Sequence, residues 1–214
     1  MSVLVLLLVV ANVLGVAMIV PQAVRLRRGS SLAGVSVVWI GLSAALNGWW
    51  LVYGVAASVW GVVPVSIGGL ALYVWMLRGA VSIAGAVAWR SAALGAAMPS
   101  TTVAPVVVVG GWATAGLVIG LWYGVQFAPA AWSVIRSVRV DGVSPATWLM
   151  AWTEAVIWFV YGLDVGDGAL LVGGGGGAVM ATVILVRLAT VRVAEAPAQP
   201  SSRPRRRNAD TVSA

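Results

Sequence analysis

One carboxylate, Glu154, lies in the middle of a long apolar stretch of the sequence. An ionisable side chain at such a depth in a membrane is energetically costly and marks a candidate functional site. A desolvated carboxyl group favours its protonated form, so Glu154 is a candidate proton carrier. The alternative is structural: a neutral acid, or one paired with the guanidinium of Arg90, that holds helices together. The sequence leaves both interpretations open.

Other reactive side chains are missing from the sequence. The chain contains no histidine and no cysteine. Histidine is the commonest general base and metal ligand, and cysteine would supply a nucleophilic thiolate. No pair of carboxylates is evident either. Acid–base, covalent and metal-assisted catalysis therefore lack their parts, and we predict a protein that is not an enzyme and has no metal or cofactor.

The composition is that of a membrane protein. Hydrophobic residues make up 61% of the 214 residues and charged residues 9%, against about 25% charged residues in an ordinary soluble domain. Apolar runs without a charge cover residues 3–20, 35–63 and 103–125, and a run of about 18 residues is long enough to cross a bilayer as a helix. We predict an all-α, multi-pass protein of the cell membrane.

The hydrophobic pattern predicts seven transmembrane helices, at residues 2–20, 35–55, 59–77, 80–98, 105–127, 143–163 and 168–187. The fourth is the least regular, because Arg90 lies near its middle. A charge there is costly unless its long side chain reaches the headgroups. Without this helix the arginine-rich segments of the two halves would fall on opposite sides of the membrane, so the charges favour seven helices over six.

The arginines also predict the orientation. All 13 basic residues are arginines, and with seven helices every arginine-rich segment faces one side, which places the N-terminus outside and the C-terminus in the cytoplasm. We predict no nucleic-acid partner, because no basic stripe covers a folded face. Residues 191–214 are rich in Ala, Pro, Ser and Arg, and we expect a disordered cytoplasmic tail that touches anionic membrane lipids.

The chain contains an internal repeat. Residues 21–54 and 129–162 align without a gap at an offset of 108 and share ten identities in 34 positions. Each unit holds three predicted helices, an odd number, so two units placed directly in tandem would be inverted. The arginines require parallel units, and a single linking helix is then needed. We predict a first repeat at 1–78, a linking helix at 79–104 and a second repeat at 105–190.

The shared residues resemble a known motif. The first copy contains Pro21-Gln22, Gly34-Val35-Ser36, Trp50 and Tyr53-Gly54. The second runs from Pro129 to Tyr161-Gly162, with Ala130 in place of the glutamine. This pattern resembles the PQ-loop motif, and the arrangement of three, one and three helices resembles the SWEET sugar transporters, whose SemiSWEET relatives have one unit per chain. The resemblance covers most of the chain up to about residue 190.

The resemblance implies a role for the prolines. In this family the proline of the PQ pair acts as a helix hinge, and Pro21, with Gln22 beside it, and Pro129 match that position. Pro145 is a further hinge candidate on the second helix of the second unit. A proline removes one intrahelical hydrogen bond and bends a helix, so a hinge is physically reasonable. The alternative is that Pro21 and Pro129 end their spans at the headgroups.

The resemblance also implies a binding pocket. Trp50 and Trp158 match a pocket position three residues before each Tyr-Gly pair, and an indole suits the faces and hydroxyls of a sugar. The alternative is packing or anchoring at the membrane surface. The family's sugar-binding asparagine on the third helix has no counterpart, since its place falls near Ser66–Gly69 and Gly174. Asn47, one turn before Trp50, is a replacement amide or forms an interhelical hydrogen bond.

Together these features predict a uniporter that moves a small solute, most plausibly a sugar, by alternating access. A proton-coupled exporter of an amino-acid-like solute is one alternative, because of Glu154. A non-transporting membrane receptor or scaffold is the other, because some proteins with this motif resemble cargo receptors. Its expected partners are the solute and membrane lipids, and a homo-oligomer stays open. A polar pocket between Trp50 and Trp158 favours transport, whereas a filled interface favours the receptor.

Overall fold

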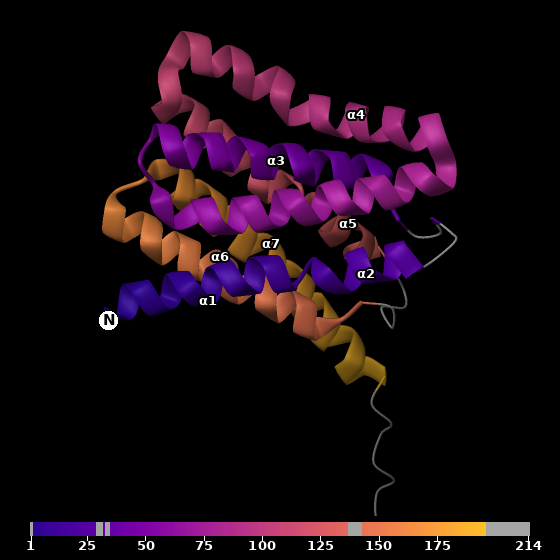
Figure 1. Cartoon of the computed structure of the whole chain (residues 1–214). Helices are drawn as coiled ribbons and strands as arrows, with labels where there is room; N and C mark the ends of the chain where they lie inside the picture. Colours follow the sequence, from indigo (N-terminus) through magenta and orange to yellow (C-terminus); the bar gives the residue numbers. More distant parts are fainter. Residues whose placement is uncertain (1, 29–31, 33–34, 137–142, 196–214) are drawn as a thin grey trace, which may run out of the picture.

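The computed structural model describes residues 2–28, 32, 35–136 and 143–195, with the side chains of Arg25 and residues 192–195 left out. Within these residues every regular element is a helix (Figure 1), so the all-α prediction is confirmed. The predicted tail lies outside the described residues from 196 onward, while residues 191–195 continue the last helix. Arg139 also lies outside them.

The first helical stretch is broken near its middle. Helix α1 spans Val3–Ala17, and α2 spans Val20–Arg28. The break at Met18 and Ile19 precedes Pro21, which occupies the second position of α2. A proline fits the first turn of a helix, where its missing N–H has no intrahelical acceptor. The helix thus restarts at Val20, with Pro21 in its first turn.

Serine caps begin the second helix of each half. Helix α3 spans Val37–Ala56, and the Ser36 hydroxyl accepts a hydrogen bond from the Trp39 amide at 3.2 Å. Helix α6 spans Pro145–Val165, and Ser144 caps it in the same way through the Thr147 amide. Each cap satisfies an amide that the first turn leaves without an intrahelical partner.

A short 3-10 helix, η1 at Trp60–Val62, leads into α4, which spans Val63–Val125. A straight helix of that length would extend about 95 Å, roughly three times the hydrocarbon thickness of a bilayer. The helical backbone is interrupted at Gly85 (φ 55°) and Gly111 (φ 69°), where glycine tolerates a positive φ. Figure 1 shows α4 turning back on itself at these points.

The breaks divide α4 into the segments 63–84, 86–110 and 112–125, which corrects several predicted bounds. The predicted loop after residue 98 is helical, although Pro99 and Pro105 lie there. The helix continues through both prolines, and the turn comes instead at Gly111. Arg90 consequently stands near the start of segment 86–110 and not at the middle of a helix, where its exposed side chain costs less.

Helices α5 and α7 complete a recurring pattern of helix bounds. Helix α5 spans Ala128–Arg136, and α7 spans Gly168–Glu195. Both bounds of α5 lie 108 residues after those of α2, and the first residues of α6 and α7 lie 108 after those of α3 and η1. The offset found in the sequence therefore recurs in the positions of the helix ends.

Four stretches are long and apolar enough to cross a membrane: Val3–Arg28, Val37–Ala56, Trp60–Arg136 and Gly168–Val191. The third, at 77 residues, is too long for one crossing. Helix α6 is not among the four; it carries the acidic side chains Glu154 and Asp164. The chain thus has several long apolar helices compatible with a multi-pass membrane protein.

Glycines bring the helices into close contact. A Cβ added at Gly41 of α3 would collide with the Ala92 carbonyl, and one at Gly95 with the Val38 carbonyl, so segment 86–110 lies directly on α3. Gly120 packs in the same manner against Ala169 and Gly173 of α7. Small residues at such crossings let helix backbones approach closely, as is common between helices in membranes.

Candidate functional site

A cavity of about 380 Å³ lies among the helices, lined by residues of α1 to α7, of η1, and of the breaks before α2 and α5. The structure brings together most of the predicted site. Trp50, Trp158 and Asn47 all line this one cavity, as do Gln22 and Glu154. Pro21, Pro129, Pro145 and Arg90 do not line it.

The lining follows the internal repeat. Ten pairs of lining residues stand 108 positions apart, namely Gly15 with Tyr123, Met18 with Gln126, Ile19 with Phe127, Gln22 with Ala130, Trp39 with Thr147, Leu46 with Glu154, Trp50 with Trp158, Val62 with Leu170, Val65 with Gly173 and Ser66 with Gly174. Equivalent positions of the two halves therefore face the same space. The cavity lies where the halves meet.

The two tryptophans are held by equivalent aromatic contacts. Trp50 packs edge-to-face on Tyr53, with ring centroids 5.8 Å apart, and Trp158 packs on Tyr161 at 6.2 Å. All four side chains are at least nine-tenths buried. Such pairs fix ring orientation and add to the burial energy, so each half presents a rigid indole to the cavity.

The hydrogen bonding of the two indoles differs. The Trp158 Nε1 donates to Glu154 Oε1 at 3.1 Å, one helical turn away on α6. The Trp50 Nε1 is buried and has no hydrogen-bond acceptor among the described residues. The reason lies in the sequence, because Leu46 occupies in α3 the position that Glu154 holds in α6. A buried donor without an acceptor costs stability and is uncommon in folded proteins.

Glu154 is 4% exposed and belongs to the cavity wall. Its Oε2 accepts a long hydrogen bond of 3.4 Å from the Tyr123 hydroxyl. A Cβ added at Gly15 of α1 would collide with Oε1, so a glycine is needed opposite the carboxyl group. Tyr123 was not predicted from the sequence, and it lies outside the aligned copies at 21–54 and 129–162.

Arg90 is separated from this carboxyl group. It is exposed on segment 86–110 of α4 and forms no ion pair with Glu154 in the described part of the chain. The pairing offered as one structural role of Glu154 is therefore wrong. The neutral donors Trp158 and Tyr123 take the place of a positive partner.

Asn47 faces the cavity with its amide partly engaged. Its Nδ2 donates to the Ser43 carbonyl of its own helix at 2.9 Å. Its Oδ1 lies against Gly69 of α4, where a Cβ would collide with it. The hydrogen bonds of the described residues thus engage this amide within α3 and not between helices. Ser66 and Gly174, close to the places where the family has its asparagine, also line the cavity.

The prolines lie beside breaks in the helices. Pro21 and Pro129 each take the second position of a short helix, α2 and α5, directly after a break. Residues of both breaks, Met18 and Gln126 among them, line the cavity. Pro145 is the first residue of α6, where it removes no intrahelical hydrogen bond. Pro145 therefore starts a helix and does not bend one.

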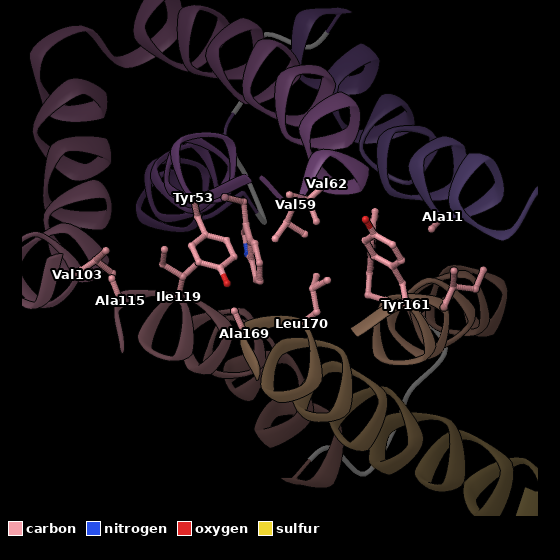
Figure 2. Close-up of a cluster of buried hydrophobic side chains, with 13 residues drawn as sticks. Ala11, Tyr53, Val59, Val62, Val103, Ala115, Ile119, Tyr161, Ala169 and Leu170 are labelled. Carbon is pink, nitrogen blue, oxygen red and sulfur yellow. The ribbon is translucent and has the colours of Figure 1, made fainter. Parts of the chain in front are cut away.

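One end of the cavity is bordered by buried apolar side chains. Figure 2 shows Val59, Val62 and Leu170 between Tyr53 and Tyr161. The Tyr53 hydroxyl donates to Asp167 Oδ2 at 2.5 Å, and Asp167 Oδ1 accepts from the Leu170 amide. Asp167 thus caps α7 and ties α3 to it. Sequence reasoning missed this contact, although an Asp just before an apolar helix is an N-cap signal.

A scan against protein-family models and a search of curated proteins find no match for the chain.

Proposed function

We propose that this protein is a membrane transporter that moves a small solute by alternating access through the cavity. Its seven transmembrane helices form two parallel three-helix repeats, within 1–78 and 105–190, joined by a linking helix. The helix ends that recur at an offset of 108 residues support the repeats. The break at Gly85 and the turn at Gly111 support a separate linking helix.

The observation that carries the proposal is the cavity lined by ten repeat-related pairs. Transporters built from parallel repeats bind their solute between the repeats, because rocking one half against the other then exposes the site to either side. A filled interface would favour a receptor or scaffold. A space of about 380 Å³ instead suits a small molecule.

The hinge and the orientation belong to the same proposal. The breaks before Pro21 and Pro129 touch the cavity, so bending at either changes its shape. Arg27, Arg28, Arg78 and Arg136 stand near the ends of helices that, in this topology, meet at one membrane face. By the positive-inside rule that face is cytoplasmic and the N-terminus is outside.

Two classes of solute are supported by different residues of the cavity. The resemblance to SWEET transporters implies a sugar moved by uniport, and Trp50 and Trp158 offer faces for a sugar ring. Glu154 favours a second candidate, a solute exchanged or cotransported with a proton, because a carboxyl group in an apolar wall either holds a proton or needs a cation.

Counterflow in proteoliposomes tests the proposal. Vesicles loaded with an unlabelled solute are diluted into a trace of the labelled one, using neutral sugars, amino sugars, amino alcohols and amino acids. Accumulation of label for at least one solute, lost in the Trp50→Ala and Trp158→Ala double variant, is the expected result. Absence of counterflow for every solute, with correctly folded protein, would show that the protein is not a transporter of these classes.

A further inference from the structure

The cavity wall holds one carboxyl group and, among the described residues, no basic side chain. Glu154 is the only carboxylic acid among the described lining residues, and none of them is an arginine. Arg27 and Arg136 instead lie over the rings of Trp75 and Trp132, outside the cavity. A buried carboxylate needs a positive partner or a proton. Since the described lining residues bring no cation, a positive partner for Glu154 would come from a ligand.

The surrounding wall is aromatic. Four tryptophans, Trp39, Trp50, Trp148 and Trp158, line the cavity together with two tyrosines and a phenylalanine. The negative faces of aromatic rings attract cations, tryptophan most strongly, and the attraction grows where water is excluded. A carboxylate within such a wall has the parts of a site for an ammonium group.

The composition of the wall also limits the rest of the ligand. Because none of the described lining residues is basic, a carboxylate on the ligand would have no partner, which disfavours a zwitterionic amino acid.

We propose that the solute is a small amine without a carboxylate, such as an amino sugar or an amino alcohol, with its ammonium group on Glu154 and the aromatic wall around it. This inference rests on the transport function proposed above and names its substrate class. Leu46 and Glu154 make the two halves of the cavity unequal, so the solute binds in one orientation along it.

Matched solutes test this in the wild-type protein. Glucosamine, glucose and N-acetylglucosamine share one ring, but only glucosamine is cationic. Isothermal titration calorimetry with the full chain in nanodiscs should show glucosamine binding at least tenfold more tightly than the other two. Aminoethanol should likewise bind more tightly than ethylene glycol. Equal affinities within each matched set would overturn the proposal without requiring any variant.

A pair of variants locates the effect. Glu154→Gln should remove the preference for glucosamine over glucose and N-acetylglucosamine. Asp164→Asn, which neutralises an exposed carboxylate on the same helix, should keep the preference. Retention of the preference in Glu154→Gln, or its loss in Asp164→Asn, would show that Glu154 is not the cation site.

The outcome is separable from that of the transport proposal. Counterflow of glucose without any preference for amines would leave a transporter standing and refute the amine site. Tight, Glu154-dependent amine binding without counterflow of any solute would support the site and refute transport.

Discussion

The indole N–H of Trp158 donates a hydrogen bond to Glu154 Oε1 across 3.1 Å. Its repeat counterpart Trp50 has no such acceptor, because Leu46 stands where Glu154 would be. The indole N–H of Trp158 therefore has a hydrogen-bond acceptor, whereas that of Trp50 has none among the described residues. Equivalent positions line both sides of the cavity, but Leu46 on one side corresponds to Glu154 on the other.

This difference predicts unequal effects of one substitution at the two positions. Trp158→Phe leaves the buried Oε1 of Glu154 without its donor and should lower the free energy of unfolding by about 1–3 kcal/mol more than Trp50→Phe. Trp50→Phe removes an unsatisfied donor and should lose only packing. Chemical or thermal unfolding in detergent micelles compares the two variants. Equal losses at the two positions would contradict the asymmetry.

The Tyr53–Asp167 hydrogen bond predicts a coupling between α3 and α7. A double-mutant cycle with Tyr53→Phe and Asp167→Asn should give a coupling energy of about 1.5–3 kcal/mol, as expected for a hydrogen bond to a charged group. Asparagine still caps a helix, so the α7 cap is kept. Tyr161→Phe is the control, because Tyr161 is the repeat counterpart of Tyr53 but its ring lies against Gly61. A coupling near zero for the tested pair would show that the bond does not stabilise the fold.

The glycines of α3 predict how the linking helix packs. Gly41→Ala should lower the free energy of unfolding by about 1–3 kcal/mol, because its Cβ would meet the backbone of Ala92. Gly48 lies on the same helix with open space around it. Gly48→Ala should therefore raise stability slightly, by about 0.5–1 kcal/mol, by reducing the freedom of the unfolded chain. Similar losses for both would mean that segment 86–110 does not lie on α3.

The ends of segment 86–110 provide a test of topology. The native chain has no cysteine, so a single engineered one reports without background. Ala86→Cys and Val109→Cys, both at exposed positions, should react with membrane-impermeant maleimide from opposite sides, Ala86 from the cytoplasm and Val109 from outside. Labelling of both from one side would remove the linking helix and with it the parallel arrangement of the repeats.

The all-helical, membrane-compatible character of the chain could be predicted from its apolar runs. The predicted starts at residues 35, 143 and 168 lie within two residues of the first residues of α3, α6 and α7, whereas the separate short helices α2 and α5 were not predicted. The extent of the helix that carries Arg90 was predicted less well. The prediction ended this helix at residue 98, whereas it continues through Pro99 and Pro105 and is interrupted only at Gly111.

The candidate site could be predicted in outline only. Glu154 was identified by its depth in an apolar stretch and the two tryptophans by the family resemblance, yet their partners depend on side-chain direction. Arg90 was chosen as a partner by charge, whereas three-dimensional packing gives Glu154 the neutral donors Trp158 and Tyr123. Asp167 lies outside the aligned repeat, at 21–54 and 129–162, and its contact with Tyr53 joins residues 114 positions apart.

The proposed amine site predicts a dependence on pH. A proton and an ammonium group compete for the same carboxylate of Glu154, so glucosamine binding should weaken as the pH falls through the range in which Glu154 takes up a proton. Glucose binding should stay constant over that range. The other titratable side chains in the cavity wall are Tyr73 and Tyr123 of α4; lining residues of α1, α3 and α7 bring no charged group. Both tyrosines are neutral at acidic and neutral pH, so the change is assigned to Glu154.

Competition of this kind also links solute movement to protons. If each crossing exchanges an ammonium ion for a proton on Glu154, a pH gradient should drive glucosamine uptake into proteoliposomes. Glu154→Gln should abolish that drive, while Asp164→Asn should preserve it. Because a carboxyl group that is only structural would never change its protonation during transport, uptake unaffected by collapse of the gradient, with binding unaffected by pH, would assign Glu154 to stability alone.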